Sequence, residues 1–322
     1  MRPPRRFNDF IGQGRLLGLL KKLVEGARAR GSAIRSMLIV GGPGQGKSAL
    51  AQALAREYGG EGESETPTFH RLIAGRGISA KAICERLRLL KFGDIVFIDE
   101  AHSLNPDSQE TLYIALDEWK IFASTEDGKL DRATFTSVAQ FALILATTLP
   151  GLILPPLRDR LTRVELDPYL VEELKAIAEA AAKSSGVEIT PQAARFLAKR
   201  SQGSPRQICQ AIDLMITLNP NVTEFNLDHG RDFFTALGID SNGLTLLQQG
   251  YLRILATTSN RMASLERLAS ALSIDGAFVR RDVEMFLVTE GFITITPRGR
   301  RITDKGLAAV QEMAQSNGGN DS

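Results

Sequence analysis

The chain has 322 residues, of which 43% are hydrophobic and 24% charged, a balance that predicts a globular protein of two or three domains and excludes a chain disordered throughout. Its formal net charge of +2 is too close to neutral to indicate nucleic-acid binding by itself. The two cysteines, Cys84 and Cys209, lack metal spacing and no apolar run approaches a membrane span, so we expect a cytoplasmic protein with buried thiols.

Three large apolar residues stand close together near the N-terminus, in Phe7-Asn8-Asp9-Phe10-Ile11-Gly12-Gln13, just after an arginine cluster. Such a segment must pack against something. Its spacing alone does not decide whether this segment packs against a nucleotide base or against the surface of its own domain. A helical pattern follows from Leu16 to Ala27.

The stretch Gly41-Gly42-Pro43-Gly44-Gln45-Gly46-Lys47-Ser48 fits the pattern G-x-x-x-x-G-K-[ST] without a mismatch. A buried strand is predicted at 37–40 and a helix after Ser48, so successive backbone N–H groups should converge on one anion. Lys47 would reach the β- and γ-phosphates, and the Ser48 hydroxyl would ligate Mg²⁺. The alternative is a glycine turn beside a chance Gly-Lys-Ser. The predicted nucleotide contacts here are Gly44, Gln45, Gly46, Lys47, Ser48 and Ala49.

A second apolar run, Ile95-Val96-Phe97-Ile98, ends in the carboxylates of Asp99 and Glu100. A buried strand would deliver Asp99 to the Mg²⁺ shell, and Glu100, pointing the other way, could orient or deprotonate the attacking water. The letters of 99–102 also spell the DEAH box of a helicase superfamily. Such a helicase needs two recombinase-like domains, and only about 160 residues follow the first domain.

Another buried strand is predicted at 141–146, followed by Thr147 and Thr148. A hydroxyl there would lie level with the γ-phosphate and the attacking water. The alternative is that the threonine only ends the strand and has no part in the chemistry. Soon afterwards come Pro156-Leu157-Arg158-Asp159-Arg160. Two arginines around an aspartate usually form a surface ion-pair cluster that contributes little.

A helical domain is predicted from about Asp167 to Gly238. One helix begins near Val171, a second has Thr190 as its N-cap before Pro191, and a third repeats the signal with Ser204 and Pro205. Arg206 falls in the first turn of the third helix, where a cation opposes the helix dipole. We interpret this arginine as a sign of a nearby anion.

The C-terminal part predicts three helices, at 246–256, 265–272 and 277–290, and then a β-hairpin across 292–303. This order matches a winged helix-turn-helix, a DNA-binding form. Arg298, Arg300 and Arg301 on the hairpin could sit against phosphates. A winged helix that contacts protein is the alternative. The tail from Gln315 is predicted to be disordered.

Taken together, these motifs resemble the RuvB family, the AAA+ motors that drive Holliday-junction branch migration in bacteria. The resemblance covers nearly the whole chain. It implies an α/β P-loop NTPase (AAA+) large domain at 1–165, an all-α lid domain at 166–240, a winged-helix domain at 241–314 and a disordered tail at 315–322. Its most specific pieces are Phe10-Ile11-Gly12-Gln13, the two nucleotide motifs, Ala146-Thr147-Thr148, Pro156–Arg160, Gly203-Ser204-Pro205-Arg206, and Gly291-Phe292 through Thr296-Pro297-Arg298-Gly299-Arg300.

The resemblance also implies roles for individual residues. Thr148 would be the sensor-1 residue, Arg160 the arginine finger acting in a neighbouring subunit, and Arg206 the sensor-2 arginine. The adenine pocket would be lined by Phe10, Ile11 and Pro205. The implied cofactors are ATP and Mg²⁺, and the implied assembly is a hexameric ring that holds DNA, junction or duplex, through the wing arginines. The family's partner is RuvA, which docks on a β-hairpin of the large domain.

The chain departs from the family pattern in three places. Gly42 and Gln45 stand where the family usually has Pro and Leu, and Leu149-Pro150 follows the threonines where an Arg is usual. The hairpin region, 121–139, is polar and does not match the family's sequence. The resemblance therefore supports the motor core better than the RuvA partnership, and a divergent ATPase serving another partner remains open.

Two classes of function share these residues. The first is an ATP-driven motor that translocates double-stranded or junction DNA. The second is a DNA-bound AAA+ switch that assembles with ATP and recruits a partner, as regulators of mobile elements do. A motor requires steady, DNA-stimulated hydrolysis, whereas a switch turns over slowly.

Overall fold

The computed structural model describes residue 4 and residues 6–59, 68–74, 78–124 and 130–318. The chain divides into two compact units, Met1–Ile177 with Gly203–Gln210, and Ala178–Gln202 with Ala211–Ser322. The N-terminal Arg2 and Arg5, most of the acidic loop, the hairpin tip and the last four residues lie outside the described residues.

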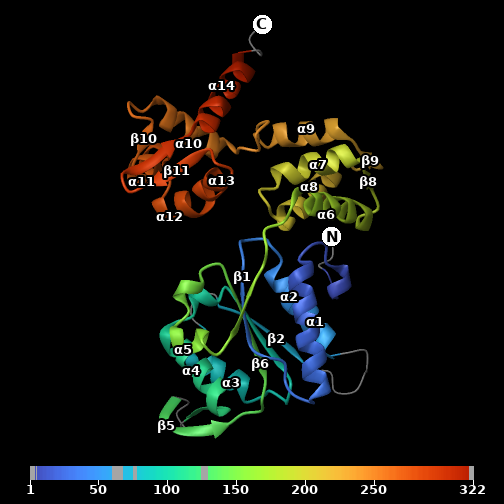
Figure 1. The fold of residues 1–322 in the computed structure, drawn as a ribbon, viewed down its shortest axis with the longest axis vertical. Helices are drawn as coiled ribbons and strands as arrows, with labels where there is room; N and C mark the ends of the chain where they lie inside the picture. The colour runs from blue at the N-terminus through green and yellow to red at the C-terminus, as the bar shows by residue number, and fades with distance from the viewer. Residues whose placement is uncertain (1–3, 5, 60–67, 75–77, 125–129, 319–322) are drawn as a thin grey trace. The chain divides into compact units, whose positions relative to one another are not determined.

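The first unit is built on a five-stranded parallel sheet of order β2-β3-β6-β1-β7 (Figure 1). The strands are β1 (Met37–Val40), β2 (Phe69–Ile73), β3 (Ile95–Asp99), β6 (Ala142–Thr147) and β7 (Thr162–Glu165). The helices are α1 (Gly14–Ala29), α2 (Lys47–Gly59), α3 (Ala80–Leu87), α4 (Pro106–Glu118) and α5 (Pro155–Arg158). The short apolar runs of the sequence therefore became strands with both faces covered, as parallel sheets require.

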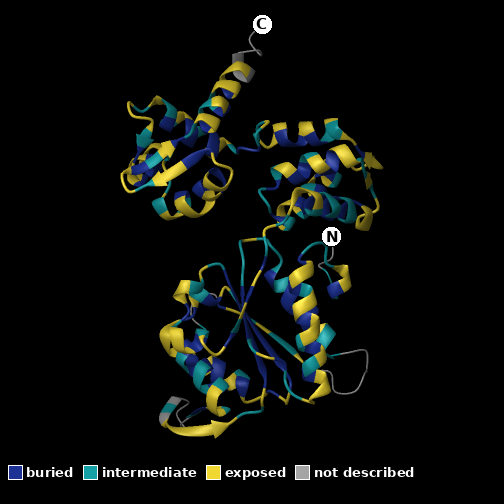
Figure 2. Ribbon diagram, in the orientation of Figure 1, coloured by how far each residue is buried: buried dark blue, intermediate teal, exposed yellow. Residues whose placement is uncertain are grey.

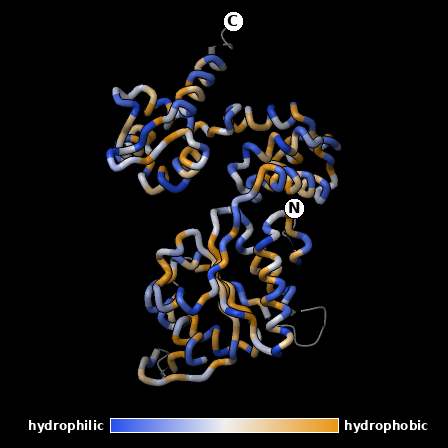
Figure 3. Tube along the Cα trace, in the orientation of Figure 1, coloured by the Kyte–Doolittle hydropathy of each residue, from blue (hydrophilic) through white to orange (hydrophobic). Residues whose placement is uncertain are grey.

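Alternate residues of the central strands enter two different cores. In β1, Ile39 packs with α1 and α2, whereas Leu38 packs with α3 and α4. The same alternation places Phe97 of β3 in the first core and Ile98 in the second. Figures 2 and 3 show the result, a buried and hydrophobic sheet between helices with polar outer faces. Period-two alternation thus builds a helix layer on each side.

The carboxyl ends of the central strands meet at one edge of the sheet. Val40, the last residue of β1, pairs with Thr147 of β6, and Ile98 of β3 pairs with Leu145. The phosphate-loop motif follows β1, and the Asp99–Glu100 and Thr147–Thr148 pairs each begin with the last residue of a strand, β3 and β6. Segments far apart in the sequence therefore converge here, as they do in open parallel sheets generally.

A separate two-stranded hairpin extends from the first unit. Its antiparallel strands are β4 (Lys120–Ser124) and β5 (Leu130–Ser137), with a register shift after Phe122. Phe122 is buried, and its ring centroid lies 5.4 Å from that of Phe135, which is 44% exposed. This is the polar hairpin region that the sequence placed at 121–139.

The helical part of the second unit includes helices with side-chain N-caps. Thr190 accepts a hydrogen bond from the Ala193 N–H and so caps the helix that begins at Pro191, as predicted. The elements are α6 (Val171–Ser184), α7 (Pro191–Arg200), α8 (Pro205–Leu218), α9 (Leu227–Ala236) and the paired strands β8 (Glu188–Ile189) and β9 (Glu224–Phe225). Helices α6 and α8 each contribute residues to both units.

The C-terminal part has the predicted helices and hairpin around one core. Its elements are α10 (Leu246–Thr257), β10 (Met262–Ala263), α11 (Leu265–Leu272), α12 (Gly276–Phe278), α13 (Glu284–Thr289), β11 (Ile293–Thr296), β12 (Gly299–Ile302) and α14 (Asp304–Gly318). The helix predicted at 277–290 is interrupted by a π-helical segment, Val279–Val283. Residues 315–318 are helical because α14 continues through them, so the disorder predicted for these four residues was wrong.

Among the described residues, none of the helices has the length and hydrophobicity needed to cross a bilayer.

Candidate functional site

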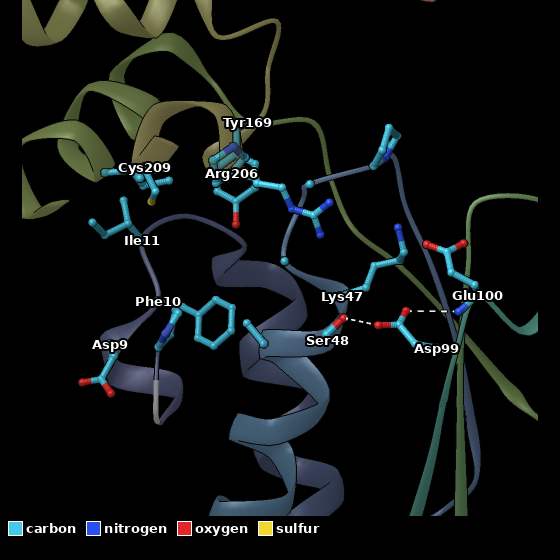
Figure 4. A pocket seen from close by; sticks show the side chains of 17 residues that line it. Asp9, Phe10, Ile11, Lys47, Ser48, Asp99, Glu100, Tyr169, Arg206 and Cys209 are labelled. Atoms are coloured by element: carbon cyan, nitrogen blue, oxygen red, sulfur yellow. Dashed lines mark hydrogen bonds between the residues drawn. The ribbon is translucent and has the colours of Figure 1, made fainter. Parts of the chain in front are cut away.

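A cavity of about 330 Å³ opens at the carboxyl edge of the sheet, within the first unit (Figure 4). Most of the predicted nucleotide contacts line it: Phe10, Ile11, Gly44, Gly46, Lys47, Ser48, Ala49, Asp99, Glu100, Pro205 and Arg206. Gln45, Thr148 and Arg160 do not. Pockets that hold a small ligand have volumes of this order, roughly 300–1,000 Å³.

The phosphate loop is held by its own side chains. Lys47 lies at the start of α2, is buried, and donates to the carbonyl oxygens of Gly41 and Gly42 at 2.9 and 2.8 Å. Burial lowers the pKa of its ammonium group, against the opposing charges of Glu100 and Asp99. Gln45 Oε1 accepts from the Gly42 N–H at 2.6 Å, so its side chain closes the loop instead of lining the cavity.

Two glycines of the loop have backbones that other residues adopt with strain. Gly44 has φ +74° and Gly46 has φ +95°. A Cβ on Gly44 would also come within 2.3 Å of Ser204 Oγ, because the start of α8 lies against the loop. The Arg206 N–H contacts the Gly44 carbonyl at 3.4 Å. The third helix of the predicted lid therefore brings Arg206 to the cavity, and its guanidinium points toward the loop in Figure 4.

Two oxygen groups meet on the acidic side of the cavity. Ser48 Oγ donates to Asp99 Oδ2 at 2.7 Å, although these residues are 51 apart in the chain. Arg71 Nη2 of β2 lies 3.3 Å from the same carboxylate oxygen. A hydroxyl and a carboxylate are hard oxygen ligands, the set that Mg²⁺ accepts together with water and phosphate oxygens. Their convergence next to Lys47 fits a magnesium–nucleotide site.

Glu100 has an unusual backbone. Its φ is +52°, in the left-handed region that few residues other than glycine adopt. The chain therefore turns sharply after β3 and enters a short 3₁₀ helix, Ala101–Ser103. Figure 4 shows the Glu100 carboxylate beside the Lys47 ammonium, at the end of the cavity opposite Phe10. Half of the Glu100 side chain is exposed, so water can reach it.

The other end of the cavity is apolar. Phe10 and Ile11 enter it from the N-terminal segment and Tyr169 from the segment after β7. Gln13 ties these two segments together, because its side chain donates to the Asp167 carbonyl at 2.7 Å and accepts from the Asp167 N–H at 3.0 Å. An aromatic ring and aliphatic side chains at this end suit a planar base.

Tyr169 is a cavity residue that the sequence reasoning missed. Burial and the nearby Glu173 charge raise the pKa of its phenol to about 12. The only signal for it was an aromatic residue directly after a buried strand, in Asp167-Pro168-Tyr169, where the helical domain was expected to begin. Cys209, interpreted as a core thiol, also lines the cavity.

Arg160 lies away from the cavity of its own chain. Its guanidinium is paired with Asp117 of α4, donates to the Pro156 carbonyl at 2.5 Å, and lies 5.3 Å from the Tyr113 ring centroid. The side chain is still 32% exposed. An intrachain ion pair is thus present, although with Asp117 and not with the adjacent Asp159.

The wing arginines differ in their surroundings. Arg298 and Arg301 are exposed on the hairpin. Arg300 is not, because its Nε and Nη2 contact the buried Glu284 carboxylate at 2.7 and 3.2 Å, and the Tyr251 hydroxyl donates to the same carboxylate at 2.7 Å. The charge of Arg300 is thus matched inside the domain, whereas those of Arg298 and Arg301 are exposed.

Comparison with known proteins gives matches to both ends of the chain. Residues 1–166 match the family model described as the Holliday junction DNA helicase RuvB P-loop domain, and residues 241–311 match the RuvB C-terminal winged helix domain. The fold is similar to the RuvB Holliday junction branch migration motor of Thermotoga maritima, with 31% identity and a TM-score of 0.81 over 96% of this chain and 98% of that one. A point mutant of the Thermotoga protein gives 30% identity and a TM-score of 0.82, with 96% and 99% covered.

Proposed function

The chain belongs to the RuvB family, and on that premise we propose that it is an ATP-hydrolysing motor that binds and translocates double-stranded or Holliday-junction DNA. The observation that carries the proposal is one cavity with a phosphate loop, two carboxylates and an arginine at one end and an apolar slot at the other. Such a cavity suits a nucleoside triphosphate with its metal ion.

The residues of the cavity divide the work of hydrolysis. Lys47 and the loop N–H groups hold the β- and γ-phosphates, and Arg206 adds a second cation near the loop. Ser48 and Asp99 would hold Mg²⁺, which would supply neutralisation of phosphate charge. Glu100 accepts the proton of the attacking water. Thr148, one residue beyond β6, is the sensor of the γ-phosphate.

The apolar end holds the adenine. Phe10, Ile11 and Pro205 form its walls, and Tyr169 adds a phenol that can donate a hydrogen bond. The base recognition site is therefore assembled from three distant segments of the chain.

Arg160 acts in a neighbouring subunit of a ring, which we propose to be a hexamer. Its distance from its own cavity and its partial exposure support a role in trans. The pair with Asp117 must then exchange for the γ-phosphate when subunits assemble. Exposed pairs contribute only about 1 kcal/mol or less, so the exchange is feasible.

DNA is held by the winged helix through Arg298 and Arg301, which are exposed. The hairpin β4–β5 is the place where a RuvA-like protein would dock, as in the family.

The experiment is to measure ATP hydrolysis with and without a four-way DNA junction, and to follow dissociation of labelled junction arms in the same reactions. If the chain is a motor, it hydrolyses ATP steadily, DNA stimulates that hydrolysis, and the junction arms separate. The Lys47→Ala variant should show no hydrolysis and no separation of the arms. Electron microscopy of the same samples shows whether rings form. Slow hydrolysis with DNA bound and the arms intact would contradict the motor and favour the switch.

A further inference from the structure

His102 lies between the carboxylate of Glu100 and the end of β6. Its Nδ1 is 3.5 Å from Glu100 Oε2 and 3.2 Å from the Thr147 hydroxyl oxygen. The imidazole is 21% exposed and Thr147 is fully buried. None of the roles assigned above uses His102 or Thr147.

The backbone at Glu100 brings the imidazole to this place. The left-handed turn starts the 3₁₀ helix at once, with the Ser103 N–H donating to the Glu100 carbonyl at 2.9 Å. His102 therefore comes within reach of Thr147, the last residue of β6. The Thr147 hydroxyl accepts a hydrogen bond from the Leu149 N–H at 3.0 Å, which closes the turn after β6. The hydroxyl is therefore held in place next to the His102 imidazole.

Of the two neighbours of Nδ1, the carboxylate favours a proton on this nitrogen, whereas the Thr147 hydroxyl can accept from Nδ1–H or donate to a bare nitrogen. An ionised carboxylate offers only lone pairs, so the nitrogen that faces it must be a donor. At 3.5 Å the contact is an electrostatic attraction longer than an ordinary hydrogen bond. A proton on Nδ1 satisfies the carboxylate and is shared with the Thr147 oxygen.

We propose that His102 is a positioning residue for Glu100, and that Thr147 holds His102 in place. The inference rests on the proposed function, in which Glu100 accepts the proton of the attacking water. The Nδ1–H group holds the carboxylate toward that water. Because Thr147 precedes Thr148, a displacement at the end of β6 reaches Glu100 through the imidazole.

A competing partner makes this contact necessary. Glu100 is close enough to Lys47 to oppose the lowering of the lysine's pKa. Without the contact to His102, the Glu100 carboxylate would be free to pair with the Lys47 ammonium. That pair would occupy both the group that accepts the proton of water and the group that binds phosphate. The contact between Glu100 and the imidazole competes with that pairing.

The test compares hydrolysis in a single turnover with equilibrium binding of an ATP analogue. His102→Ala should bind the analogue normally and hydrolyse ATP about 10- to 100-fold more slowly, a part of the usual contribution of acid–base catalysis. In a Glu100→Gln chain the same substitution should have no further effect, because effects that pass through one residue are not additive. Thr147→Val should behave like a weaker His102→Ala, and Thr147→Ser should restore the rate.

His70→Ala is the matched control, since His70 also pairs with an acid, Asp94, at 3.1 Å, at the opposite end of β3. It should leave the single-turnover rate unchanged. If His102→Ala hydrolyses at the wild-type rate while Glu100→Gln is inactive, only the positioning role is overturned. If Glu100→Gln hydrolyses normally, the proposed function fails as well.

A second measurement does not depend on activity. Long-range ¹H–¹⁵N spectra of the chain labelled in its three histidines report which ring nitrogen is protonated. We expect His102 to carry its proton on Nδ1 and to lose that preference in Glu100→Gln/Thr147→Val. A proton on Nε2 in the unsubstituted chain overturns the inference.

Discussion

Replacing Arg300 with Met should loosen the wing without removing a DNA contact. Glu284 and Arg300 have side chains 2% and 14% exposed, so the substitution leaves a buried carboxylate whose remaining side-chain partner, among the described residues, is the Tyr251 hydroxyl. Removing one member of a buried ion pair costs about 3–5 kcal/mol. Arg301→Met is the matched control, because Arg301 is the next residue on the same strand and is exposed. Its cost should be about 0.5 kcal/mol or less.

Hydrogen exchange of the full chain measures this cost locally. In Arg300→Met, amides of α13 and of β11–β12 should exchange about 100- to 4,000-fold faster, the factor that corresponds to ~3–5 kcal/mol. Adding Glu284→Gln should recover most of the loss, because the unpaired charge is gone.

Measurements of DNA binding distinguish the role of Arg300 from that of Arg301. Arg301→Met should lower the slope of log affinity against log salt by about 0.9, one phosphate contact, and so should Arg298→Met. Arg300→Met/Glu284→Gln should keep the slope. A slope lowered by that amount in the double variant, together with unchanged exchange in Arg300→Met, would refute the assignment of Arg300 to the domain interior.

The remaining predictions concern the nucleotide cavity. Lys47→Ala should lose binding of a labelled ATP analogue, whereas Glu100→Gln should bind it and stall; a Glu100→Gln chain that fails to bind would make the carboxylate structural. Arg160→Ala should bind ATP and hydrolyse it about 10³- to 10⁵-fold more slowly, and mixing with Lys47→Ala should restore turnover. If mixed rings form and no activity returns, Arg160 is not a finger in trans. Since the pKa of Tyr169 is raised to about 12, the unfolded chain ionises first, so the free energy of unfolding should fall between pH 10 and 12, and Tyr169→Phe should reduce that fall in denaturation curves.

Local signals explain most of what the sequence predicted correctly. The strand at 37–40, the cap at Thr190 and the helix at 265–272 depend on neighbouring residues only, so they can be read without knowing the fold. The meeting of Ser48 with Asp99 is a longer-range result, yet it follows from one rule, that parallel strands end at the same edge.

Partners across the fold could not be predicted in this way. The sequence showed an excess of positive charge on the wing, but not that Glu284 would take up the charge of Arg300 from a helix 16 residues earlier. Asp117 and Arg160 are 43 residues apart, and no spacing rule connects them. Tyr169 reaches the cavity because Gln13 holds its segment, 154 residues away. The sequence gives the number of charged and aromatic side chains, whereas the tertiary packing determines which partner each of them contacts.

The left-handed backbone of Glu100 has a consequence for protein engineering. A non-glycine residue in this region stores about 1–3 kcal/mol of strain, which glycine does not suffer. Selection of variants for heat resistance alone would therefore enrich Glu100→Gly, a chain that survives better and has lost the group that acts on water. A library built on this scaffold has to be sorted by turnover as well as by survival, because at this position the two traits favour opposite residues.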